Sequence, residues 1–66
     1  MDRIELTLSD GEILGCYVGD HVTHNLRGIS GTIVGLGDTA NTVKIKLDDT
    51  GETAEVTAEN FQDYWE

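Results

Sequence analysis

The chain has 66 residues, of which 13 are acidic and four are basic, and its formal net charge at pH 7 is -9. A domain of this size buries only about 60% of the surface that its unfolded chain exposes, which leaves room for a thin core and not for a supported enzyme cleft. The negative charge opposes a sequence-independent grip on phosphates and favours positively charged partners. We therefore expect one small domain, residues 1–66, that is not an enzyme and takes no cofactor.

Residues 3–17 have the pattern of a β-hairpin. Ile4, Leu6 and Leu8 alternate with polar residues, which is the two-residue period of a strand with one buried face. Asp10-Gly11 follows, and an Asp-Gly pair between two strand-like runs is a strong signal for a tight turn, because Gly accepts a positive φ without cost. A second strand then completes the hairpin.

The middle of the chain has short strand-like runs separated by glycine-rich turns. Residues 21–24 form a short predicted strand with Val22 on its inner face. Residues 31–35 have a β-branched centre, and the glycines at both ends permit a bulge or a close approach of two backbones. The composition of residues 37–41 predicts a turn.

Residues 43–47 are the clearest amphipathic strand, because three aliphatic residues alternate with two lysines. Residues 48–51 again have the composition of a turn. Residues 53–57 follow as a strand, and alternation places Ala54 and Val56 on its inner face.

Thr57 is a suitable N-cap for one helical turn at residues 58–61. No segment keeps a 3.6-residue apolar stripe for three turns, so we expect no helix beyond that turn. The residues expected in the core are Ile4, Leu6, Val22, Ile33, Val43, Ile45, Leu47, Val56 and Phe61.

Short strands at regular spacing, joined by glycine turns, predict an all-β fold. We expect a small antiparallel barrel of about five or six strands with an N-terminal β-hairpin, since closure removes exposed strand edges.

Four stretches within residues 19–61 support a more specific interpretation. They are Gly19 to Val22, Arg27 to Val34, Val43 to Leu47 and Asp48 to Glu52. In this order they resemble the KOW and Tudor-like small barrels, and a basic residue followed by glycines, as at Arg27, Gly28 and Gly31, is part of the KOW pattern. The resemblance implies a Src-homology-3-like fold. It also implies, for most relatives, binding to RNA, DNA, a ribosome or polymerase machinery through a basic face or exposed aromatic residues.

Cys16, His21 and His24 do not form a metal site in the sequence. Side chains at i and i+3 of a strand point to opposite faces, so the two histidines cannot share an ion. The carboxylates of residues 48–52 lack the spaced ligands of a calcium loop. We expect no metal. The single cysteine and the absence of a signal peptide or a membrane-spanning run favour a cytoplasmic protein.

The segment 48–66 has seven acidic residues and no Lys or Arg, and it includes two large aromatic residues. Carboxylates here would attract a basic partner, and Tyr64 and Trp65 could be interface anchors or could pack in the core. The predicted partner-binding residues are Asp48, Asp49, Glu52, Glu55, Glu59, Asp63, Tyr64 and Trp65.

Three functions follow from these observations. The first is a non-enzymatic interaction module or adaptor that binds a protein with a basic surface. The second is a nucleic-acid mimic, of the kind found in phages and mobile elements, that inhibits an enzyme acting on DNA or RNA. The third is KOW-like binding to nucleic acid or a ribosome, which requires Arg3, Arg27, Lys44 and Lys46 to lie on one face.

Overall fold

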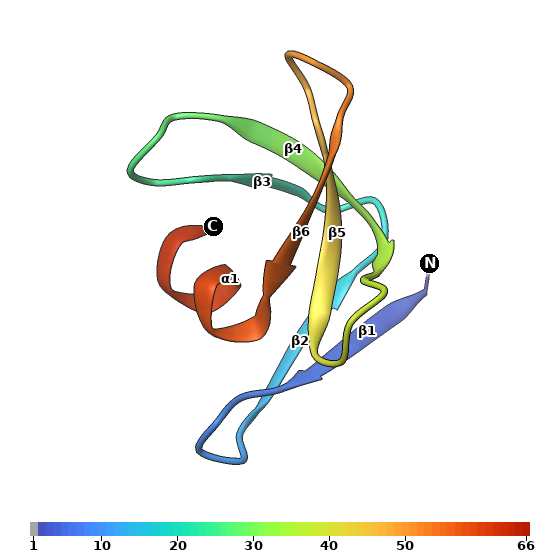
Figure 1. Cartoon of the computed structure of the whole chain (residues 1–66), viewed down its shortest axis with the longest axis vertical. Helices are drawn as coiled ribbons and strands as arrows, with labels where there is room; N and C mark the ends of the chain where they lie inside the picture. Colours follow the sequence, from blue (N-terminus) through green and yellow to red (C-terminus); the bar gives the residue numbers. More distant parts are fainter. Residues whose placement is uncertain (1) are drawn as a thin grey trace.

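The computed structural model describes residues 2–66 as six strands and one short helix (Figure 1). The elements are β1 (Arg3–Thr7), β2 (Ile13–Tyr17), β3 (His21–Thr23), β4 (Ser30–Leu36), β5 (Thr42–Leu47), β6 (Thr53–Thr57) and α1 (Ala58–Tyr64). All strand pairs are antiparallel. They form a two-stranded sheet, β1-β2, and a four-stranded sheet, β3-β4-β5-β6. The predicted all-β class is confirmed, whereas the strands of residues 2–66 do not pair into a closed barrel.

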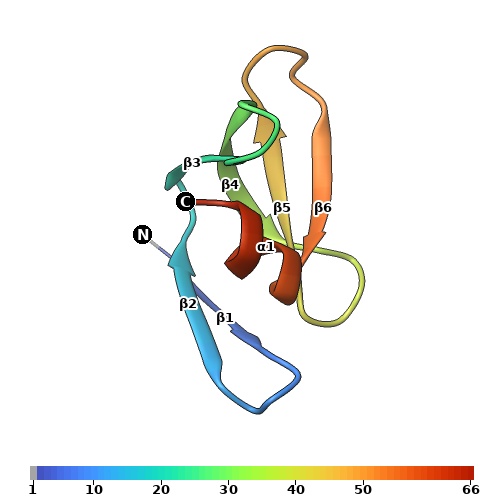
Figure 2. The same ribbon diagram turned by 90° about the vertical axis from the view of Figure 1, so that its left-hand side faces the viewer.

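The predicted N-terminal hairpin is present, with Arg3 opposite Tyr17 and Leu6 opposite Leu14. Gly11 has a φ of +90°, as the Asp-Gly turn requires. One face of the hairpin is buried in the common core, and Figure 2 shows the hairpin and the four-stranded sheet on either side of α1. The hairpin is tied to the rest of the chain by the Ser9 N–H, which donates to Glu59 Oε2 at 2.8 Å.

Strands β4 and β5 show both features that the glycines of residues 31–35 permit. The register shifts between Ile33 and Gly35, which is a β-bulge. A Cβ added at Gly31 would lie 2.6 Å from Lys46 O and 2.6 Å from Ile45 Cγ2, so only glycine fits this approach of the two strands.

The core is one cluster that joins both sheets and the helix. Eight of the nine predicted core residues are buried, and Leu47 is only partly buried. Leu47 lies at the end of β5, where it packs against the core and also lines a pocket. The core also contains Leu8, Cys16, Ala58 and Trp65, which are not among the nine predicted core residues.

The helix is longer than the sequence predicts. Thr57 is the N-cap, as expected, and its side-chain oxygen accepts the Asn60 N–H at 3.3 Å. The expectation of a single turn is wrong, because α1 extends to Tyr64. Ala58, Phe61 and Trp65 form an apolar stripe at helical spacing that buries one face of this short element. No helix within residues 2–66 is long and apolar enough to cross a membrane.

Candidate functional site

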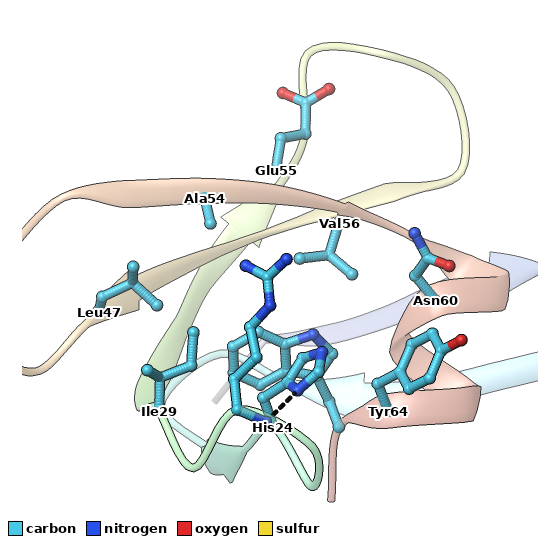
Figure 3. Close-up of a pocket in the computed structure, with 10 residues that line it drawn as sticks. His24, Ile29, Leu47, Ala54, Glu55, Val56, Asn60 and Tyr64 are labelled. Carbon is cyan, nitrogen blue, oxygen red and sulfur yellow. Dashed lines mark hydrogen bonds between the residues drawn. The ribbon is translucent and has the colours of Figure 1, made fainter.

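A pocket of about 330 Å³ lies between the loop that joins β3 to β4, the strand β6 and the helix α1 (Figure 3). Its apolar surface includes Ile29, Leu47 and Val56, and its aromatic wall includes Tyr64 and Trp65. The volume is near the lower end of the range of small-ligand pockets, which is about 300–1,000 Å³. The pocket is therefore large enough for one anchoring side chain of a partner.

His24 organises one wall of this pocket. Its ring is stacked on Tyr64, with centroids 5.3 Å apart, and meets Trp65 edge to face at 5.2 Å. Its Nδ1 accepts the backbone N–H groups of Leu26 at 3.3 Å and of Arg27 at 3.1 Å. Nδ1 is therefore unprotonated, and the ring fixes both the loop and the aromatic wall.

The C-terminal residues cover the outer side of β3. Thr23 and Glu66 exchange two backbone hydrogen bonds, of 3.1 and 3.0 Å, and the Asn25 N–H donates to Tyr64 O at 2.7 Å. This pairing holds Trp65 against the core, where its side chain is 8% exposed. Of the two roles considered for Trp65, this burial supports packing in the core. Tyr64 is 36% exposed and lines the pocket.

Three of the predicted acidic residues lie together in the turn that joins β5 to β6, at the top of Figure 1. Asp48, Asp49 and Glu52 are all exposed. Asp48 Oδ2 is 2.8 Å from His21 Nε2, and such an exposed pair contributes little to stability. This turn directly follows Leu47, which lines the pocket.

Glu55 has an internal role that the sequence did not reveal. Its carboxylate accepts the backbone N–H groups of Asp38 and Thr39, each at 3.1 Å, and the Thr42 hydroxyl at 3.2 Å. These hydrogen bonds lower the pKa of Glu55 below its ordinary value, and the bond from the Asp38 N–H has the largest effect. Figure 3 shows the Glu55 carboxylate directed away from Val56 and the pocket.

Glu59 and Asp63 lie on α1 and are exposed. Glu59 also has an internal role, since it accepts the Ser9 N–H of the hairpin. The backbone oxygen of Asp63 accepts Asn25 Nδ2 at 3.5 Å, which leaves its carboxylate available to a partner. The predicted acidic set is therefore divided between carboxylates that face solvent and carboxylates that hold the fold together.

The four basic residues do not share one face. Lys44 and Lys46 alternate with buried residues of β5 and face away from the core, and Lys44 Nζ lies 3.0 Å from Asp38 Oδ1. Arg27 lines the pocket, on the core side of the sheet. Arg3 is on β1, where it contacts Glu5 and Tyr17.

Within residues 2–66, no group of three or more His, Cys, Asp or Glu side chains is arranged to hold a metal ion. The three residues considered for such a site are used differently. His21 contacts Asp48, and His24 accepts backbone N–H groups. Cys16 is buried, and burial, followed by the charge of Asp20, raises the pKa of its thiol.

The sequence did not point to the loop at residues 24–29 as part of a site. One signal was available, because Leu26 is a large apolar residue in a polar, glycine-containing loop. Its side chain is 76% exposed beside the pocket lined by His24, Arg27 and Ile29. Exposed apolar residues next to a pocket are typical of interaction sites.

Comparison of the chain with protein-family models, with curated proteins and with solved structures gives no match.

Proposed function

We propose that the chain is a non-enzymatic interaction module that binds a segment of a partner protein, with an apolar residue of that segment in the pocket and basic residues beside it. The observation that supports this proposal most directly is a pocket with apolar lining residues and with exposed carboxylates one or two residues along the chain from that lining. We define the acidic rim as Asp49, Glu52, Asp63 and Glu66.

Each member of the acidic rim is exposed and lies one or two residues from a residue that lines the pocket. Asp49 and Glu52 follow Leu47 and precede Ala54, at the end of β5 and the start of β6. Asp63 and Glu66 flank the Tyr64-Trp65 pair. A basic partner segment would be steered to the pocket by these charges and retained by burial of its apolar residue.

The nucleic-acid mimic is the alternative function. A mimic presents a row of free carboxylates in place of phosphates, whereas Glu55 and Glu59 are engaged within the fold. That engagement favours the adaptor. The third function, direct binding to nucleic acid, is disfavoured because Arg27 and the two lysines of β5 lie on different sides of the sheet.

We also infer a Src-homology-3-like arrangement of the two sheets, as the KOW resemblance implies. The support is a pair of hydrogen bonds that joins the end of the hairpin to β4, from the Gly19 N–H to Ile33 O at 2.8 Å and from the Ile33 N–H to Asp20 O at 2.9 Å. An experimental structure without this junction would contradict the inference.

The function can be tested by affinity capture from the source organism, followed by kinetics with the captured protein. Replacing Asp49 and Glu52 with Lys should slow association and flatten its dependence on salt, because charge complementarity acts mainly on the association rate. The matched control replaces Asp2, which precedes β1, and Glu12, which lies between β1 and β2, with Lys, and it changes the net charge equally.

Equal effects of the two double variants would contradict a localised acidic rim. Capture of a DNA- or RNA-acting enzyme whose nucleic-acid site is blocked would favour the mimic over the adaptor.

A further inference from the structure

We propose that the partner segment binds as an added β-strand along the open edge of β6, with its apolar side chain in the pocket. This inference rests on the proposed function and states the binding mode and the chemistry of the segment. The bound segment would be a fifth strand of the sheet β3-β4-β5-β6.

The pocket lies on the face of β6 that carries Ala54 and Val56, and β6 is an outer strand of its sheet. Ala54, Glu55 and Val56 all line it, although they are consecutive residues of one strand. Side chains alternate between the two faces of a strand, so Ala54 and Val56 face the pocket, whereas Figure 3 shows the Glu55 carboxylate on the opposite face. No other strand of residues 2–66 pairs with this side of β6.

The hydrogen-bond pattern identifies which backbone groups of β6 are open. The Leu47 N–H donates to Glu52 O at 2.8 Å, and the Ala58 N–H donates to Asn41 O at 3.0 Å. In an antiparallel pair, bonded and non-bonded residue pairs alternate, and the register places Ile45–Ala54 and Val43–Val56 in the bonded series. The N–H and C=O groups of the intervening residues of β6 therefore point away from β5.

Those open groups belong to Thr53 and Glu55, which are both exposed. None of the backbone hydrogen bonds formed outside the helix and the strand ladders of residues 2–66 uses them. Two residues with open N–H and C=O groups can form four hydrogen bonds with an antiparallel segment. The edge therefore offers a template for a strand next to a cavity that accepts a side chain.

The geometry also defines the pattern of the segment. Its residues opposite Thr53 and Glu55 would have side chains on the outer face, and the residue between them would point into the pocket near Val56 and Leu47. The Glu55 carboxylate is bound by the Asp38 and Thr39 N–H groups, so the charge that favours basic residues on the outer face comes from the acidic rim, whose Glu52 directly precedes Thr53. The segment therefore has basic and apolar residues in alternation.

A second copy of this chain is a poorer occupant of the same edge. Each chain has a formal charge of -9, and the acidic rim would face an acidic surface instead of a basic one. Like charges along an edge oppose pairing between sheets. The charge therefore selects a basic segment of a different protein.

The experiment uses a capped ten-residue peptide in which Lys and Val alternate, and measures its affinity for the whole chain by calorimetry. Two further peptides have the same sequence but are N-methylated, one at the central lysines and the other at the central valines. The lysine amides would donate to Thr53 and Glu55, whereas the valine amides would point away from β6. Methylation of the lysines should weaken binding by about tenfold or more, because hydrogen bonds are lost and the strands are pushed apart, and methylation of the valines should have little effect.

Two additional measurements complete the test. On binding, hydrogen exchange of the Thr53 and Glu55 amides should slow, while exchange in β1 should be unchanged. A peptide with Glu in place of Lys should not bind.

The results separate the binding mode from the proposed function. Equal effects of the two methylations, with binding retained, would overturn strand addition and leave the interaction module in place. Absence of binding by any basic peptide, or a concentration-dependent dimer that protects the same amides, would overturn strand addition. Binding of the Glu peptide as tightly as the Lys peptide would overturn the proposed function as well, since it would remove the role of the acidic rim.

Discussion

The two outer edges of the four-stranded sheet differ in whether other residues of the chain cover them. The outer side of β3 is covered by the chain's own C-terminal residues, through hydrogen bonds of Thr23 and Asn25 with Glu66 and Tyr64. The outer side of β6 has no such cover within residues 2–66. The C-terminal residues therefore cover the edge at β3 and leave the edge at β6 open. Two of them, Tyr64 and Trp65, also form the aromatic wall of the pocket beside β6.

An open edge is a liability in most sheets, because its unpaired groups invite association with other chains. Here the open edge lies beside an apolar pocket and is bordered by carboxylates, which restrict the set of chains that can approach it. The difference between the edges is therefore consistent with one structural edge and one binding edge. Four substitutions test that distinction.

The largest effect is expected at the covered edge. Replacing Trp65 with Ala should lower the free energy of unfolding by about 3–5 kcal/mol, because it removes a large buried side chain and loosens the cover over β3. Urea denaturation would measure this loss. The matched control is replacement of the adjacent Tyr64, which is more exposed and should cost less; equal losses would contradict the assignment of Trp65 to the core.

The centre of the sheet should respond next. Ile45 is fully buried in β5, between the two edges, and its replacement with Ala should cost about 2–5 kcal/mol. That is a large part of the stability of so small a domain, so a marked fall in the thermal midpoint is expected. Lys46→Ala, at the exposed neighbouring position, should change the midpoint little. An unchanged midpoint for Ile45→Ala would show that the packing of β5 is wrongly described.

A smaller effect is expected at the loop between the covered edge and the pocket. His24→Ala should cost about 1–2 kcal/mol, because the Leu26 and Arg27 N–H groups lose their shared acceptor. Asn can supply a side-chain oxygen at a similar place, so His24→Asn should recover part of the loss. Equal denaturation midpoints for the two variants would show that the loss comes from ring packing and not from these hydrogen bonds.

The smallest effect on stability is expected for Glu55 of β6, and it depends on pH. The pKa of Glu55 is lowered in the folded chain, first by the Asp38 N–H, so the folded state favours the ionised form. Its stabilising contribution is complete above the ordinary pKa of 4.5 and is lost as the pH falls through the lower folded value. Glu55→Gln should reduce this acid sensitivity, measured as urea midpoints at about pH 7 and pH 3. The same acid sensitivity in the variant would assign the effect to other carboxylates.

Much of the fold was predictable because its signals are local. The alternation in residues 3–8 and 43–47, the Asp10-Gly11 turn and the Thr57 cap each depend on neighbouring residues, and each is found in the structure. Local signals also identified the glycines that permit the bulge and the close approach at Gly31.

The candidate site was less predictable because it depends on contacts between distant segments. Nothing near Glu55 in the sequence indicates that the N–H groups of Asp38 and Thr39 will bind its carboxylate, and Glu59 meets Ser9 across 50 residues. Alternation shows which face of β6 is buried, but it does not show whether another strand covers the edge. The burial of Trp65 likewise depends on a contact between distant segments, its antiparallel bridge with His24.

Cys16 can be used as a native probe of how often the β1-β2 hairpin detaches from the core. Cys16 is 6% exposed on the inner face of β2, and burial raises the pKa of its thiol, so it is a poor nucleophile in the folded state. A thiol reagent can label it only when the hairpin detaches from the core, and at low reagent concentration the labelling rate measures how often that happens. The native cysteine can thus report whether a ligand at β6 stabilises the whole molecule or only the sheet that it extends.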